Sequence, residues 1–239
     1  MVGDLVEKLA LGSSGKLNPV AAFLGGLVGH EVIKASSGKY KPLSQFAHFD
    51  FVEALSDAPV VEADCAPCGS RYDGQIAVFG KALQAKIAAL NVFMVGAGAL
   101  GCEFIKNFAL MGVGTGDAGS FTLTDMDEIE KSNLNRQFLF RNKDIGHLKS
   151  EAASRAVSDM NAEFASTAWS EKVAPDTEAK FNDDFWDSKD LIVNALDNVE
   201  VKNGAGWCGT RRRGTGRREG GCCFVARSTS SFPAELACS

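Results

Sequence analysis

Apolar and polar positions change their period several times along the chain, and short apolar runs alternate with segments of helical spacing. Buried strands produce the first pattern and amphipathic helices the second. The pattern predicts strands at 91–95, 121–125 and 191–196 and helices at 81–90, 99–112, 149–160 and 175–186. Strands that alternate with helices favour a parallel sheet with right-handed crossovers. The predicted fold class is therefore α/β, a Rossmann-like parallel sheet with flanking helices.

The first 56 residues carry a separate pattern. Asn18 and Pro19 have the form of a helix N-cap and a first helical residue, and Gly38 supplies a C-terminal stop. The aromatic run at 46–51 predicts a strand. One helix and one strand bury too little surface for a core of their own. Residues 1–56 are therefore interpreted as the end of a domain.

Composition divides the rest of the chain. Residues 57–70 are rich in Pro, Asp, Cys and Gly, which predicts a linker before a main domain at 71–200. Residues 201–239 contain seven Lys or Arg and two Asp or Glu residues, a net charge of +5 in a chain of net charge −5. Two interpretations of this Gly/Arg/Cys-rich tail stay open. It is either a basic nucleic-acid-binding or targeting tail or, as we prefer, disordered sequence from another reading frame or a retained intron.

Hydrophobic residues make up 45% of the 239 residues and charged residues 23%, as in ordinary soluble globular proteins. The start has no basic region followed by an apolar core, so no signal peptide is expected. The most apolar stretch, 20–28, is much shorter than the roughly 20 residues that span a membrane. We therefore expect a soluble intracellular chain with no membrane partner.

The seven cysteines do not have the spacing of a metal site or of a secreted disulfide framework. Cys65 and Cys68 form one C-x-x-C pair, but zinc needs a second pair, and the adjacent Cys222 and Cys223 lack that spacing. We interpret the cysteines as reduced loop thiols.

A G-x-G-x-x-G turn at 96–101 follows the first strand of the main domain. Gly96 and Gly98 permit a tight turn and the approach of a phosphate, and Gly101 permits close packing of helix on strand. The helix that starts near Ala99 offers free N–H groups and the positive end of its dipole to an anion. Asp125, at the end of the next strand, is placed to accept hydrogen bonds from ribose hydroxyls. These features predict a nucleotide site.

Two classes of enzyme fit this turn. A nicotinamide-dependent oxidoreductase would bind a pyrophosphate on it, whereas a nucleotidyl-transfer enzyme must also neutralise a triphosphate with cations and hold magnesium with a carboxylate. Arg136 and Lys149 lie in the loop after the second strand and at the next helix start, and Asp197 follows the third strand. This combination favours ATP over NAD.

Several runs in this region resemble the active adenylation domain of eukaryotic ubiquitin-activating enzymes, a ThiF/MoeB-like family. The runs are 71–76, 95–99, 124–127, 130–141 and 194–198. Residues 16–55 resemble the end of the inactive adenylation half of these enzymes. The resemblance covers roughly residues 5–200, so the chain is similar to a truncated part of them. The wider family also contains activators of other ubiquitin-like proteins and bacterial sulfur-carrier adenylyltransferases.

The resemblance implies a ThiF-type adenylation domain that uses ATP and Mg²⁺ to adenylate the C-terminal glycine of ubiquitin or a ubiquitin-like protein. This reaction is the first step of ubiquitination. The implied partners are ubiquitin, the inactive adenylation half and a conjugating enzyme, without nucleic acid. The implied location is the cytoplasm and the nucleus. Beside this activity, a catalytically incomplete nucleotide-binding fragment and an NAD-dependent oxidoreductase stay as alternatives.

The resemblance also implies site residues. Those that would bind ATP are Gly96, Gly98, Ala99, Gly101, Asp125, Asp127, Asn133, Arg136, Gln137, Lys149, Asp197 and Asn198. Arg136 and Lys149 would stabilise the charge of the transition state, and Asp197 would position magnesium. Arg136, Lys149 and Asp197 are thus the predicted catalytic residues.

The chain departs from the family in three places. Gly74 stands where bacterial relatives have an arginine, which the ubiquitin-activating enzymes supply from the inactive half. None of the seven cysteines matches the family's catalytic cysteine, and no stretch of these residues is expected to form the family's ubiquitin-fold domain. We therefore expect an incomplete Rossmann-like domain in which 191–196 lacks some of its neighbouring strands.

Overall fold

The computed structural model describes residues 3, 6, 10, 13–49, 51, 55, 60–196 and 223–226. The chain divides into two compact units, residues 1–86 and 87–239. The domain boundaries expected from the sequence at residues 56, 70 and 200 stay predictions. No helix among the described residues is long and apolar enough to cross a membrane.

The first unit contains the predicted helix, α2 (Asn18–Ser37). It ends as expected at Gly38, whose backbone is left-handed (φ 64°) and whose N–H donates to Lys34 O. The N-cap is Leu17, which has extended backbone geometry, so the prediction of Asn18 as the N-cap was wrong by one residue.

The strand predicted at 46–51 is wrong. The described residues of this stretch have no strand, and the rings of Phe49 and Phe51 pack edge-on against Phe23 of α2, with centroids 5.1 and 5.5 Å away. A strand must pair its backbone with a neighbouring strand. The described part of this unit provides none, so the aromatic side chains pack on the helix instead.

The predicted linker contains a short helix, α3 (Glu62–Cys65), and is followed by α4 (Asp73–Ala88). Helix α4 confirms most of the helix predicted at 81–90 and extends it backwards across a kink at Gly80 (φ 79°). This left-handed backbone favours glycine, and a Cβ on Gly80 would also lie 2.4 Å from Asp64 Oδ2. Cys65 and Cys68 are free thiols.

The second unit is built on a sheet of strand order β3-β2-β1-β4-β5. The strands are β1 (Asn91–Val95), β2 (Ser120–Thr124), β3 (Ser166–Trp169), β4 (Leu191–Asn194) and β5 (Cys223–Ala226). The first four run parallel to their neighbours, which confirms the predicted Rossmann-like class. The pattern missed β3 because Ser-Thr-Ala-Trp is neither apolar nor long.

Strand β5 corrects the prediction of a wholly disordered tail. It pairs antiparallel with β4, with Cys223 opposite Asn194 and Ala226 opposite Leu191. Without it, β4 would expose a row of unpaired N–H and C=O groups at the sheet edge. The sequence predicted that 191–196 lacks some of its neighbouring strands; in the described residues β4 is paired on both sides, with β1 and with β5.

Helices α5 (Ala99–Met111) and α6 (Lys149–Ser158) confirm two predicted helices. The helix predicted at 175–186 is wrong, because a 3-10 turn η4 (Pro175–Thr177) and a short helix α7 (Asp183–Asp187) occupy this stretch. Asn182 starts α7 anew by accepting a hydrogen bond from Phe185 N at 2.9 Å. The 3-10 turns η2 (Lys131–Asn133) and η3 (Asn142–Asp144) lie between β2 and α6.

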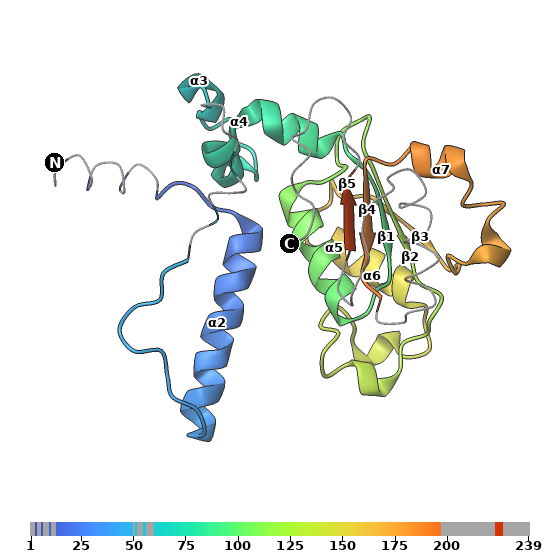
Figure 1. Cartoon of the computed structure of the whole chain (residues 1–239), viewed down its shortest axis with the longest axis horizontal. Coiled ribbons are helices and arrows are strands. Elements are labelled where there is room, and N and C mark those ends of the chain that lie inside the picture. Colours follow the sequence, from blue (N-terminus) through green and yellow to red (C-terminus); the bar gives the residue numbers. More distant parts are fainter. Residues whose placement is uncertain are drawn as a thin grey trace, which may run out of the picture. The chain divides into compact units, whose positions relative to one another are not determined.

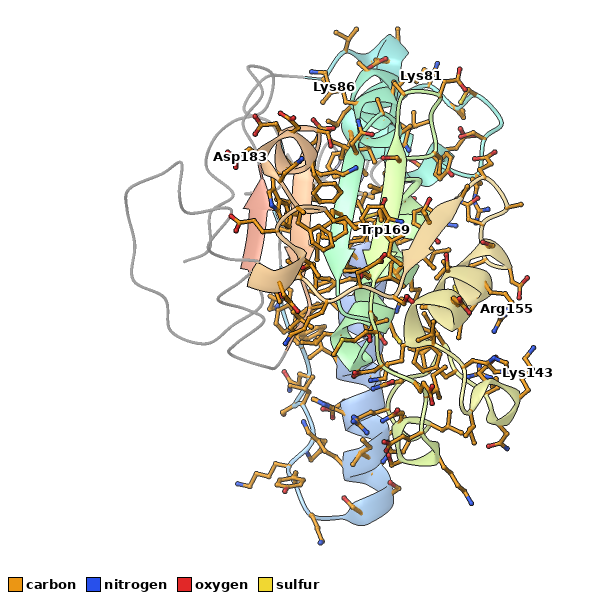
Figure 2. The ribbon with its side chains drawn as sticks, turned by 90° about the vertical axis from the view of Figure 1, so that its right-hand side faces the viewer. Lys81, Lys86, Lys143, Arg155, Trp169 and Asp183 are labelled. Carbon is orange, nitrogen blue, oxygen red and sulfur yellow. The ribbon has the colours of Figure 1, made fainter. Side chains whose placement is uncertain are left out.

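The sheet is covered on both faces. Helices α5 and α7 lie on opposite sides of it, and α6 packs against α5, β2 and β3 (Figure 1). On the α7 side, Phe93 of β1 is fully buried among Phe181, Phe185 and Trp186. Figure 2 faces this side, with Trp169 at the end of β3 and Asp183 at the start of α7 labelled. This core fixes the carboxyl ends of β1, β2 and β4, where the site lies.

Candidate nucleotide-binding site

The glycine turn joins β1 to α5 at the carboxyl edge of the sheet. Gly96 has a φ of 99°, and a Cβ on it would lie 2.8 Å from Ala195 O. A Cβ on Gly101 would lie 2.2 Å from Gly96 O, whereas one on Gly98 would meet nothing within 4 Å. Gly101 thus serves close packing and Gly96 the left-handed turn, as predicted, and Gly98 leaves open space at the helix start.

Helix α5 begins at Ala99, with Gly98 as its N-cap in extended conformation and without a side-chain cap. The first backbone hydrogen bond of the helix runs from Cys102 N to Gly98 O. The first N–H groups of a helix have no partner within it, and together they form the positive end of its dipole. The turn can therefore receive an anion such as a phosphate.

Asp125 is hydrogen-bonded to this turn. Its Oδ2 accepts a hydrogen bond from Ala97 N at 2.6 Å, and its Oδ1 accepts one from Asp127 N at 2.9 Å. Its own N–H donates to Trp169 O, which ties the end of β2 to β3. The structure thus brings Asp125 to the glycine turn, as the spacing of the two motifs predicts.

Burial raises the pKa of the Asp125 carboxyl, although the N–H groups of Ala97 and Asp127 and the nearby Lys149 act in the opposite direction. Because the pKa is above the unfolded value of about 3.9, the folded state binds this proton more tightly than the unfolded state. The group therefore contributes stability that is complete below about pH 3.9 and is lost as the pH rises through the folded pKa.

We therefore expect wild-type protein to lose stability relative to Asp125→Asn as the pH is raised from acid to neutral. Urea unfolding of both proteins, followed by circular dichroism over this range, measures the difference between their free energies of unfolding. Curves that stay parallel at every pH would contradict the prediction.

Lys149 is the first residue of α6, and its side chain is only 11% exposed. Its Nζ donates to Asp127 Oδ2 at 2.8 Å, and its backbone N donates to Asp127 O at 2.9 Å. Lys149 and Asp127 line a pocket of about 330 Å³ together with Asn133. The other residues that line this pocket are Glu128, Ile129 and Glu130. The structure therefore joins Lys149 to Asp127 beside Asp125.

The loop after β2 places the other predicted phosphate ligands. Asn133 is buried and its Oδ1 accepts Glu130 N at 2.9 Å, which closes the 3-10 turn. Gln137 is 3% exposed, and its Oε1 has no hydrogen-bond partner among the described residues. Arg136 is exposed and its Nη1 donates to Ser132 O at 3.1 Å. The guanidinium thus contacts its own loop, through Ser132 O and Asn135 Oδ1.

Asp197 and Asn198 lie outside the described residues. In the part of the chain that the structure describes, no group of three or more His, Cys, Asp or Glu side chains could hold a metal ion. Both oxygens of Asp125 accept N–H groups, and Asp127 pairs with Lys149. The assignment of magnesium to Asp197 therefore stays a prediction.

Cys102 lies beside the glycine turn but is not a reactive thiol. It is fully buried, with Sγ 3.7 Å from Ala97 O, and burial raises its pKa to about 12. Nucleophilic cysteines react as thiolates. Cys102 is therefore a core residue, which agrees with its exclusion as the catalytic cysteine.

Sequence reasoning missed two polar residues at this edge. Ser150 is fully buried, and its Oγ donates to Asp125 O at 3.0 Å. Asn194 is 6% exposed at the end of β4, and its Oδ1 has no hydrogen-bond partner among the described residues. The sequence did contain a signal for both residues. Ser150 directly follows Lys149, and Asn194 is a polar residue at the end of an apolar strand.

Comparison with known proteins agrees with this geometry. Residues 72–204, more than half of the chain, match the ThiF family. The chain is 52% identical over 201 residues to ubiquitin-activating enzyme E1 1 of Schizosaccharomyces pombe, covering 83% of this chain and 20% of that protein. It is 52% identical over 200 residues to ubiquitin-like modifier-activating enzyme 1 of Dictyostelium discoideum, with the same shares covered. The chain thus spans about a fifth of the length of these relatives.

A solved structure shows the same fold. The E. coli tRNA N6-threonylcarbamoyladenosine dehydratase in complex with ATP has a TM-score of 0.52 at 24% identity, covering 59% of this chain and 56% of that chain. The sheet, the glycine turn and the family match lead to one conclusion. The chain belongs to the ThiF family.

Proposed function

We propose that this chain binds ATP at the glycine turn and adenylates the C-terminal carboxylate of ubiquitin or a ubiquitin-like protein. In this reaction a carboxylate oxygen attacks the α-phosphorus of ATP and forms a new O–P bond. The bond from the α-phosphorus to the bridging oxygen breaks, and pyrophosphate leaves with the electron pair. The two relatives are named a ubiquitin-activating enzyme and a ubiquitin-like modifier-activating enzyme, and these names support this substrate.

The observation that carries the proposal is the placement of Lys149. Its side chain is largely buried and its ammonium pairs with Asp127, whose N–H donates to Asp125. Asp125 in turn accepts a hydrogen bond from Ala97 N in the glycine turn. A dinucleotide bound for hydride transfer presents only a pyrophosphate, whereas a triphosphate also needs cations for its remaining charge. An ammonium held beside the turn therefore supports ATP over NAD.

The other residues take roles that fit their positions. The N–H groups at the start of α5 would bind a phosphate, and Asp125 would accept hydrogen bonds from the ribose. Asn133, which lines the pocket, and Gln137 would donate hydrogen bonds to phosphate oxygens from their side-chain amide N–H groups. Arg136 would have to turn from Ser132 O toward the nucleotide. Magnesium, which would neutralise part of the triphosphate charge, is assigned to Asp197 with Asn198 beside it.

Pyrophosphate exchange tests this function. The purified chain is given ATP, magnesium and labelled pyrophosphate, with and without ubiquitin, and the label that appears in ATP is measured. We expect exchange that requires ubiquitin and stops when EDTA removes the metal. ATP binding without exchange would favour the alternative of a nucleotide-binding fragment, which the coverage of a fifth of the relatives keeps relevant. NAD-dependent redox turnover would contradict both.

A further inference from the structure

The contacts of Asp127 connect the glycine turn to the start of α6. Its N–H donates to Asp125 Oδ1, and the other oxygen of Asp125 accepts Ala97 N in the turn. Its Oδ2 accepts Lys149 Nζ at 2.8 Å. Asp127 is thus the residue through which the turn and Lys149 are joined.

The backbone of this region is held without the Asp127 carboxylate. Residues 127–129 pair with 146–149 through hydrogen bonds from Lys149 N to Asp127 O, from Ile129 N to His147 O and from Gly146 N to Ile129 O. An antiparallel bridge between Glu128 and Leu148 lies in the same ladder. The carboxylate itself is 59% exposed. Its removal should therefore leave the fold intact.

The ion pair matters more for Lys149 than for Asp127, because the Lys149 side chain is the more buried of the two. The Lys149 side chain is only 11% exposed, and a charge carried by a largely buried side chain requires a partner of opposite sign. In the described residues its hydrogen-bonded ion pair is with Asp127. An ammonium has three N–H donors, so one can stay on Asp127 while the others meet phosphate oxygens.

We propose that Asp127 is a positioning residue that acts through Lys149 and does not itself bind ATP. It holds the flexible lysine side chain by one N–H, so that the charge is directed into the pocket before the nucleotide arrives. This inference rests on the proposed function for the identity of the ligand. The pairing of Asp127 with Lys149 can be tested without it.

The first test measures the reactivity of Lys149 in the nucleotide-free chain. Amine acetylation with a limiting reagent, followed by mass spectrometry, gives the labelling rate of each lysine. Asp127→Ala should make Lys149 react several-fold faster, because the ammonium is released to solvent. Glu171→Ala is the matched control, since Glu171 pairs with Lys180. It should accelerate Lys180 and leave Lys149 unchanged. An unchanged rate of Lys149 in Asp127→Ala would overturn the inference.

The second test separates kcat from KM in pyrophosphate exchange. Asp127→Ala should lower kcat about 10-fold with a much smaller change in the KM for ATP, because misplacing a reacting group by about 1 Å costs up to about 100-fold. Glu171→Ala should not change kcat. A lower KM at unchanged kcat would mean that Asp127 competes with ATP for Lys149, and a raised KM alone would mean that it binds ATP. Either result overturns the inference. Absence of exchange by the wild-type chain overturns the proposed function, and the labelling test still decides the role of Asp127.

Discussion

Lys149→Ala should lower ubiquitin-dependent pyrophosphate exchange by about 100-fold or more. Removing one preorganised electrostatic contact to a developing charge typically costs about 10² to 10³ in rate. The lysine is well placed for this role because its ammonium is held by Asp127 and its side chain is only 11% exposed. A desolvated charge acts more strongly on a ligand than a solvated one. The loss should appear mainly in kcat.

The fold should survive this change. Asp127, left without its lysine, is 59% exposed and can be solvated by water. Lys180→Ala is the matched control, because Lys180 is also paired with an acid but lies over Trp169, with Nζ 4.1 Å from the ring centroid. That variant should keep wild-type exchange. Exchange by Lys149→Ala within about two-fold of wild type would remove this residue from the catalytic machinery.

Gly101→Ala should destabilise the second unit by about 3 kcal/mol. An alanine in a helix normally stabilises it by about 1 kcal/mol relative to glycine. Here the new Cβ would lie 2.2 Å from Gly96 O and 2.9 Å from Gly96 C, both backbone atoms of the turn. Overpacking of this kind typically costs about 1 to 3 kcal/mol, and rigid backbone atoms place it at the upper end. Helix α5 would have to move away from β1.

Gly98→Ala provides the comparison within the same motif. Its Cβ would meet no atom within 4 Å, so its stability should change by less than about 1 kcal/mol. Its methyl group would instead occupy the open side of the turn and should weaken ATP binding. Urea unfolding and binding of a fluorescent ATP analogue measure the two effects. Equal stability of Gly101→Ala and wild type would contradict the packing role assigned to Gly101.

The central part of the fold could be predicted because local pattern and tertiary structure agree there. Strand β1 is apolar throughout and buried, and α5 has one apolar face. The errors lie where long-range pairing or a single side chain decides the structure. Strand β3 forms because β2 offers it an edge, and α7 starts where Asn182 caps it. Neither signal is visible in the apolar period.

The site divides in the same way. The glycine turn and Asp125 could be predicted because their chemistry follows from strand ends that share one sheet edge. The contact between Asp127 and Lys149 could not, because it depends on a loop of more than 20 residues that folds back onto residues 127–129. Backbone hydrogen bonds between 127–129 and 146–149 hold the end of the loop in this position. The position of the Arg136 guanidinium also could not be predicted from the sequence, since it contacts its own loop.

Adenylation of ubiquitin by this chain is tested most directly by following the α- and γ-phosphates of ATP separately. The chain is incubated with magnesium, ubiquitin and ATP labelled at either the α- or the γ-phosphate, and the label bound to ubiquitin is measured after acid quenching. Adenylation predicts that the α-label becomes bound to ubiquitin while the γ-label leaves in pyrophosphate. Transfer of the γ-label to ubiquitin, or turnover of NAD in place of ATP, would contradict adenylation of ubiquitin by this chain.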